Sequence, residues 1–292
     1  MPTPRHATAL ASLASLALLG ASGCELLGSA SGAVAGLACP ELRGGDALSA
    51  QFSVDARANG KVRAFVQAAK DLAGVSVQAE AEITEACSRM GADLGLPPAA
   101  MAPRGEAGGR ASGACGNVAA RIDAILRAGG GVEVQVTPPS CQASADAGAR
   151  CSGACGAQGQ AAAGPQGGQA SGDAECNASC KAHADVNASC SPVVVLVRPR
   201  AGTPDAQRLA ATLQANLPLL LHAQIALGKR VLASAQVVAQ VGAALPKIVG
   251  QAGAHAIACI GAATEATASA SARLNVSVQA SVSVSGRVGA GG

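Results

Sequence analysis

Aromatic residues are almost absent from this chain of 292 residues, which has two phenylalanines and neither tyrosine nor tryptophan. Charged residues make up only 13% of the chain, and its net charge of +3 is not gathered into a basic stripe. Nucleic-acid-binding proteins normally carry clustered lysine and arginine, or aromatic side chains on which bases stack. We therefore expect no nucleic-acid partner.

The sequence also lacks the short motifs of the common enzyme classes. It has no G-x-S-x-G nucleophile elbow, no P-loop and no dinucleotide-binding glycine fingerprint. His222 and His255 occur without an H-E-x-x-H pattern that would mark a metal site. A solvated helix face explains the acidic cluster of Glu80, Glu82 and Glu85. These absences predict a protein that is not an enzyme and that holds neither a cofactor nor a metal ion.

Small residues dominate what is present, with 71 alanines and 37 glycines. A hydrophobic core must therefore come from leucine, valine and isoleucine, helped by the close approach of alanine-faced helices. Such a core buries less apolar surface per residue than an ordinary one, so covalent cross-links should matter more than usual.

The N-terminal segment has the pattern of a bacterial export signal. Residues 7–23 are uncharged and apolar, and they end in the sequence Leu19-Gly20-Ala21-Ser22-Gly23-Cys24. This ending resembles the lipobox of bacterial lipoproteins. The resemblance implies cleavage of a signal peptide at 1–23 and attachment of lipid to Cys24, which would anchor the chain to a membrane. An ordinary secretory signal, with Cys24 removed or held in a disulfide, is the alternative.

The residue that follows the anchor bears on which membrane is used. In lipoproteins of the enteric type, an aspartate after the lipidated cysteine retains the protein in the inner membrane. Glu25 stands there instead, so the resemblance favours the outer membrane of the cell envelope. We expect residues 24–46 to be the lipid anchor and a tether, and residues 47–292 to be a single domain.

The cysteine count fits this assignment. Eleven cysteines leave one unpaired, but setting Cys24 aside for lipid leaves ten that can all form disulfides in an oxidising compartment. Six of the ten are separated by 9, 3, 20, 3 and 9 residues, which is a palindrome. A chain reversal near residue 165 would pair each cysteine with its mirror image, giving Cys141–Cys190, Cys151–Cys180 and Cys155–Cys176.

The inner four of these cysteines resemble the twin C-x3-C pattern of helical-hairpin peptides, the α-hairpinins. That resemblance implies two short helices joined by nested disulfides, although Gly148 and Gly153 make the first arm a poor helix. A zinc site that also uses His183 is the alternative, but the spacing is not the usual C-x2-C and export favours oxidation. We therefore expect a disulfide-linked hairpin insertion over residues 141–190.

Four cysteines remain, and they can pair in three ways. We favour Cys87–Cys259 with Cys39–Cys115, because Cys87 and Cys259 both lie on apolar helical faces. The sequence leaves the other two pairings open.

Periodicity gives a coarse architecture. Strand patterns occur at residues 47–56, 132–136, 193–197 and 274–285. Helical patterns occur at residues 59–94, which Gly74 should kink or divide, at 117–127, and in three segments that begin at Pro204, Pro218 and Pro246. A mobile loop is expected at residues 95–113 and a disordered tail at 286–292.

Two of these strands flank the cysteine palindrome directly. Pairing residues 132–136 with 193–197 in antiparallel fashion would bring Cys141 and Cys190 together, so the sheet and the disulfides require the same chain reversal. We predict an α+β fold in which an antiparallel sheet of about four strands is covered by alanine-rich helices.

Two classes of function remain. The first is a non-catalytic envelope lipoprotein with a structural, assembly or protein-interaction role, whose hairpin or serine-faced strand at 274–285 meets an envelope partner. The exposed strand would suit strand addition. The second is a lipoprotein that binds a small ligand or a surface. Taken whole, the chain is similar to the alanine- and glycine-rich, cysteine-bearing lipoproteins of Gram-negative bacteria with GC-rich genomes.

Overall fold

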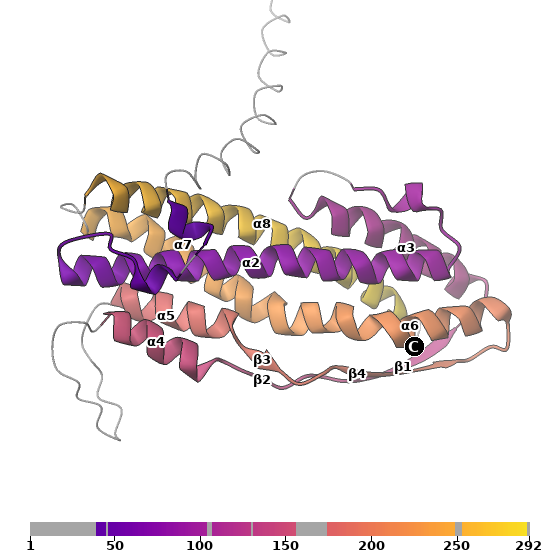
Figure 1. Ribbon diagram of the computed structural model, residues 1–292. Helices are drawn as coiled ribbons and strands as arrows, with labels where there is room; N and C mark the ends of the chain where they lie inside the picture. Colours follow the sequence, from indigo (N-terminus) through magenta and orange to yellow (C-terminus); the bar gives the residue numbers. More distant parts are fainter. Residues whose placement is uncertain are drawn as a thin grey trace, which may run out of the picture.

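The computed structural model describes residues 39–44, 46–103, 107–129, 131–155, 174–248 and 253–290. These residues form an elongated bundle of helices with a narrow β-ribbon along one side (Figure 1). The longer helices are α2 (Ala56–Asp93), α3 (Gly109–Arg127), α6 (Pro204–His222), α7 (Lys229–Ile248) and α8 (Ala254–Ala290). The shorter helices are α4 (Ala145–Cys155) and α5 (Ala174–Val186). The strands are β1 (Val132–Thr137), β2 (Cys141–Gln142), β3 (Ser189–Cys190) and β4 (Val194–Pro199).

Helix α2 is the axis of the bundle and contacts α3, α5, α6, α7 and α8. It begins where the Asp55 side chain accepts a hydrogen bond of 2.7 Å from the Ala58 amide, which satisfies one of the free donors of a helix start. The prediction that Gly74 divides this helix is wrong, because α2 is continuous over 38 residues. The large side chains that it buries lie on one stripe: Phe65, Leu72, Ile83 and Met90.

The expected C-terminal strand at residues 274–285 is instead part of helix α8, which packs against α2, α3 and α7. The helix buries Leu274, Ser277, Ser281, Val284 and Val288, a spacing of three and four residues. Two of these positions are serines, and small residues let alanine-rich helices approach closely. The expected disordered tail at 286–292 is also helical as far as residue 290.

The expected strand at residues 47–56 is absent. Ala47–Ser49 form the 3-10 turn η2, in which the Asp46 side chain accepts from the Leu48 amide at 3.0 Å. The Asn59 side chain then accepts from the Phe52 and Ser53 amides, at 2.7 and 3.1 Å. These side chains take the place of a neighbouring strand as hydrogen-bond partners.

Several boundaries also differ from those expected, among them Pro246, which lies inside α7 and does not begin a helix. The segment at 95–113 is not only loop, because it holds the 3-10 turn η3 (Pro98–Met101) and the start of α3 at Gly109, eight residues before the predicted helix start at 117. Pro218 does not begin a helix but lies inside α6. Helix α6 ends at His222, and the π-helical segment η4 (Ala223–Gly228) follows it.

The tether expected at residues 24–46 is shorter than predicted. Cys39 is fully buried, and Pro40–Leu42 form the 3-10 turn η1, so the last part of the expected tether belongs to the packed body.

The predicted pairing of the two central strands is confirmed. Strands β1 and β4 are antiparallel, with Val134 opposite Val197 and Val136 opposite Val195. Strands β2 and β3 continue the ribbon, with Cys141 opposite Cys190. The fold is therefore α+β, with a small antiparallel sheet component covered by helices, and its sheet consists of two two-stranded pieces.

Helix α6 closes the free edge of β4. The Gln214 side chain accepts a hydrogen bond of 2.7 Å from the Val197 amide and donates one to the Val195 carbonyl. A single amide side chain thus occupies the donor and acceptor that another strand would use. Unpaired strand edges invite association with other chains, and this contact removes part of that edge.

Candidate functional site

The cysteine hairpin lies at one end of the bundle, beside the first turns of α2 (Figure 1). Its three disulfides pair as the palindrome predicts: Cys141–Cys190, Cys151–Cys180 and Cys155–Cys176. The inner two join α4 to α5. The first arm is helical, contrary to expectation, because two disulfides and the packing of α4 on α5 outweigh the low helix propensity of its glycines.

The hairpin is fitted closely to α2. A Cβ atom on Gly60 would lie 2.9 Å from the Ala154 carbonyl oxygen, so only glycine allows this approach. Cys151 is fully buried in a cluster that includes Ala64 of α2. The cysteines therefore fix the hairpin to the bundle as well as closing it.

His183, the histidine of the alternative zinc site, pairs with an aspartate instead. Its Nδ1 donates to the Asp71 carboxylate on α2, which also accepts from Asn187 at 2.9 Å and from Gln67 at 2.8 Å. The neighbouring cysteine sulfurs are bonded to one another. This arrangement joins α5 to α2 and does not support a zinc site that uses His183, although Cys151, Cys155 and Cys180 lie within 4.8 Å of one another.

The remaining four cysteines do not pair as we favoured. The structure has Cys39–Cys259 and Cys87–Cys115 in place of Cys87–Cys259 and Cys39–Cys115. Cys87 and Cys259 are both on apolar helical faces, but they belong to separate hydrophobic clusters. Periodicity identifies a buried face without indicating which other face it meets, and that is why the preferred pairing fails.

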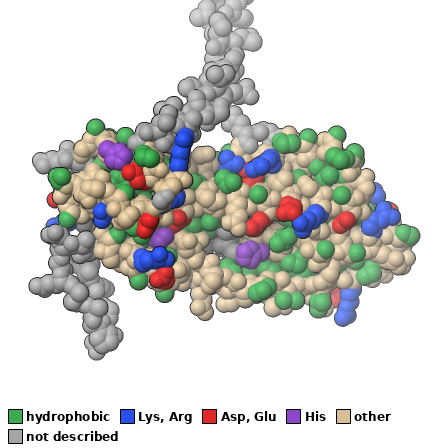
Figure 2. All heavy atoms as spheres, in the orientation of Figure 1, with side chains coloured by type: hydrophobic (Ala, Val, Ile, Leu, Met, Phe, Trp, Pro, Cys, Tyr) green, Lys and Arg blue, Asp and Glu red, His purple; other side chains and the backbone are tan. Residues whose placement is uncertain are grey.

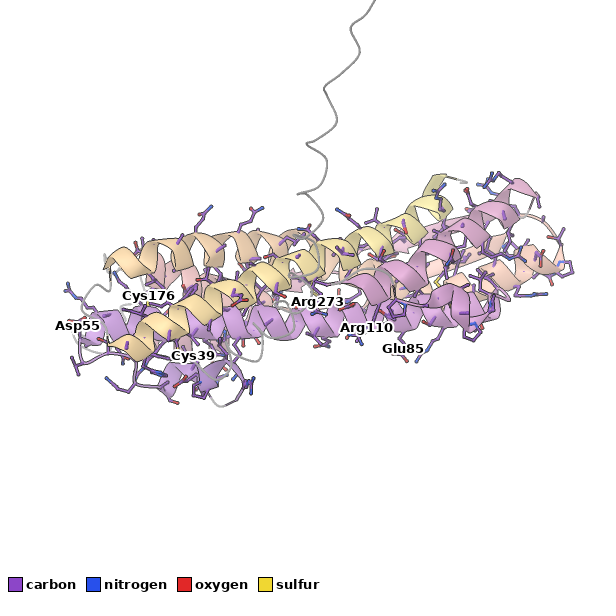
Figure 3. All side chains as sticks on the ribbon, turned by 90° about the horizontal axis from the view of Figure 1, so that it is seen from above. Cys39, Asp55, Glu85, Arg110, Cys176 and Arg273 are labelled. Atoms are coloured by element: carbon purple, nitrogen blue, oxygen red, sulfur yellow. A yellow bond between two sulfur atoms is a disulfide. The ribbon has the colours of Figure 1, made fainter. Side chains whose placement is uncertain are left out.

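Sequence reasoning missed a cluster around the Cys39–Cys259 disulfide. The Glu41 Oε2 atom lies 3.4 Å from Cys39 Sγ and 3.5 Å from Cys259 Sγ. His255 Nε2 lies 3.2 Å from Glu41 Oε1 and 3.9 Å from Cys259 Sγ. The His255 ring stacks on Phe52 at a centroid distance of 5.7 Å. Figure 3 shows that Cys39 lies at the same end of the bundle as Cys176 of the hairpin. The sequence offered one signal of this cluster: His255 and Cys259 are four residues apart, which places them on the same face of a helix.

The acidic cluster on α2 is only partly solvated. Glu82 and Glu85 are exposed as expected, but Glu80 is 1% exposed, which corrects the interpretation of all three as a surface face. Its carboxylate pairs with Arg273 of α8 and lies 3.6 Å from the Nε atom of Arg110 on α3. Figure 3 shows Arg110 and Arg273 close to each other along the bundle. This buried acid holds three helices together.

The described part of the surface includes two small hollows. One, of about 290 Å³, is lined by Ile125, Ala128, Thr203, Pro204 and Asp205. The other has about 90 Å³ and lies between α5 and α7. Sites for small organic ligands generally occupy roughly 300–1,000 Å³. His222, the other histidine considered above, lies in the last turn of α6 and lines neither hollow.

The surface shows no strong charge of one sign on the face drawn in Figure 2, where basic and acidic side chains are intermixed. Among the described helices, none is long and apolar enough to cross a membrane. Cys24 and the signal segment lie outside the described residues. Comparison with protein-family models, curated proteins and solved structures finds no match to this chain.

Proposed function

We propose that this protein is a non-catalytic lipoprotein of the bacterial cell envelope, held to the outer membrane by lipid on Cys24. The observation that supports this proposal most is the use of cysteine. Five disulfides take up ten of the eleven cysteines, and the one left over is the cysteine at the end of the lipobox-like sequence. A secreted protein seldom keeps an unpaired thiol without a use for it.

The body of the protein is proposed to act as a structural or interaction module. Its partly buried ionisable groups, such as Glu80 and Asp71, make contacts that join helices. The outer face of β4 exposes Val194 and Leu196, at 54% and 51%. We assign this face to contact with an envelope protein, through side chains and not through addition of a C-terminal strand.

Cell fractionation tests the anchor. We expect the wild-type protein in the membrane fraction and Cys24→Ser in the soluble fraction, because the substitution removes the only thiol to which the lipid could attach. The control is Cys141→Ser with Cys190→Ser, which removes two other cysteines and should stay with the membrane. Wild-type protein in the soluble fraction, or membrane retention of Cys24→Ser, would contradict the proposal.

A further inference from the structure

The Cys39–Cys259 disulfide has neighbours that a purely structural disulfide does not need. Both sulfur atoms lie within 3.5 Å of one carboxylate oxygen of Glu41. A disulfide sulfur carries no proton, so neither sulfur can donate a hydrogen bond to that oxygen. Reduction to thiols would supply two donors to this oxygen, and a cation lying between the sulfurs and the oxygen would bind both.

The contacts of Glu41 with both sulfurs, and of His255 with Glu41 and Cys259, have the spacing of a tetrahedral metal site, whereas the two sulfurs are bonded to each other and must move apart on reduction to complete it. Zinc binds sulfur at about 2.3 Å and nitrogen or oxygen at about 2.0–2.2 Å, which places adjacent tetrahedral ligands roughly 3.2–3.8 Å apart. The separations observed between Glu41, His255 and the sulfurs run from 3.2 to 3.9 Å. Cys39, Glu41 and Cys259 also lie mutually within 4.8 Å, the range over which three groups can hold one ion.

The surroundings suit a site that can open and close. Both cysteines are fully buried, whereas the side chains of Glu41 and His255 are 22% and 45% exposed, which leaves an approach from solvent. His255 and Cys259 are one turn apart on α8 and therefore share a face. The Phe52 ring stacks on His255 and limits the orientations that the imidazole can take.

We propose that reduction of the Cys39–Cys259 disulfide creates a Zn²⁺ site formed by Cys39, Cys259, His255 and Glu41. An external dithiol breaks the S–S bond by exchange: two electrons and two protons pass to the two sulfurs, and the dithiol becomes a disulfide. Zn²⁺ then binds the two thiolates, and the two thiol protons go to solvent. Oxidation by a disulfide reverses both steps and releases the ion. This site is independent of the proposed lipid anchor, because none of its residues belongs to the lipobox.

Zinc titration of the purified chain tests the site. The protein is reduced, freed of reductant without air, and titrated with Zn²⁺ against a chromophoric chelator. We expect reduced wild-type protein to bind one more tight Zn²⁺ than His255→Ala, and oxidised protein to bind none at this site. Loss of a direct ligand should weaken binding by at least the roughly 10–100-fold that loss of a supporting partner costs. Glu41→Gln should also weaken it. Both variants keep all the cysteines. Zinc bound by the other reduced cysteines is therefore the same in each protein and cancels when a variant is compared with the wild type.

The matched control is Cys87→Ser with Cys115→Ser, which removes a different disulfide; adding His255→Ala to this variant should again cost one tight Zn²⁺. Helicity is followed in parallel by circular dichroism. Equal zinc binding by reduced wild type, His255→Ala and Glu41→Gln would overturn the proposal. Loss of helicity on reduction that Zn²⁺ does not restore would overturn it as well.

Discussion

At the scale of single residues, Glu80 is the charged group on which the packing of three helices depends. Its side chain is 2% exposed, and its two arginine partners, Arg110 and Arg273, come from α3 and α8. The Arg110 amide also donates to it at 3.2 Å. A carboxylate removed from water loses its hydration, and the two arginine side chains and the backbone amide offset that loss.

We expect Glu80→Gln to lower the free energy of unfolding by about 1.5–3 kcal/mol, because the charged hydrogen bonds are lost while both arginines can rehydrate. Glu85→Gln is the control. Its side chain is 61% exposed, and its pair with Arg89 should contribute less than about 1 kcal/mol. Chemical denaturation of both variants measures the difference. If both variants lost the same free energy of unfolding, the buried Glu80 cluster would stabilise the protein no more than an exposed ion pair does.

The sequence could identify which cysteines pair across the palindrome, but not that Glu80 is buried. The palindrome is a local pattern, and one reversal of the chain accounts for all of it. Glu80 depends on Arg273, which is 193 residues further along the chain. Glutamates at positions 80, 82 and 85 look alike until α8 is placed against α2.

At the scale of elements, helix α8 shows why a regular alternation can mislead. Valine and serine alternate through residues 274–285, which is the pattern of a half-buried strand. The same residues also place Leu274, Ser277, Ser281 and Val284 on one helical face. Serine is small enough to lie between closely packed helices, so polarity alone does not indicate exposure here. The packing of α8 against three other helices decides between the two patterns.

Strand β4 allows a second experiment at this scale. Gln214→Ala removes both hydrogen bonds to the edge of β4, so we expect the free energy of unfolding to fall by about 1–2 kcal/mol. The uncovered edge should also increase self-association. Gln207→Ala, at an exposed position on the same helix, is the control. Denaturation and analytical ultracentrifugation give the two results. A variant as stable and as monomeric as the control would show that Gln214 does not protect the edge.

At the scale of the whole molecule, the disulfides compensate for a core built from small side chains. Cys39–Cys259 joins segments 220 residues apart, and Cys87–Cys115 joins α2 to α3. Such cross-links limit the unfolded chain, and their effect is larger for longer loops in the chain-entropy account. That cross-links matter more than usual in this composition stays a prediction.

The α+β class of the fold could be predicted from the sequence, but the division of the chain between helix and strand could not. The ribbon of β1 and β4 was predictable because apolar strands and cysteines demanded the same reversal. The segments at 47–56 and 274–285 were not, because Asn59 in one case and neighbouring helices in the other provide partners that no local pattern reveals. The position of the Glu41–His255 cluster was hidden for the same reason, since its two halves are 214 residues apart.

The intact mass of protein extracted from membranes tests the central claim most directly. We expect a chain that begins at Cys24, carries the added mass of acyl chains, and has ten hydrogens fewer than the reduced form, two for each of five disulfides. Mild reduction should add those ten hydrogens and leave the acyl mass in place. A chain without acyl mass, or one cleaved after Cys24, would contradict the account.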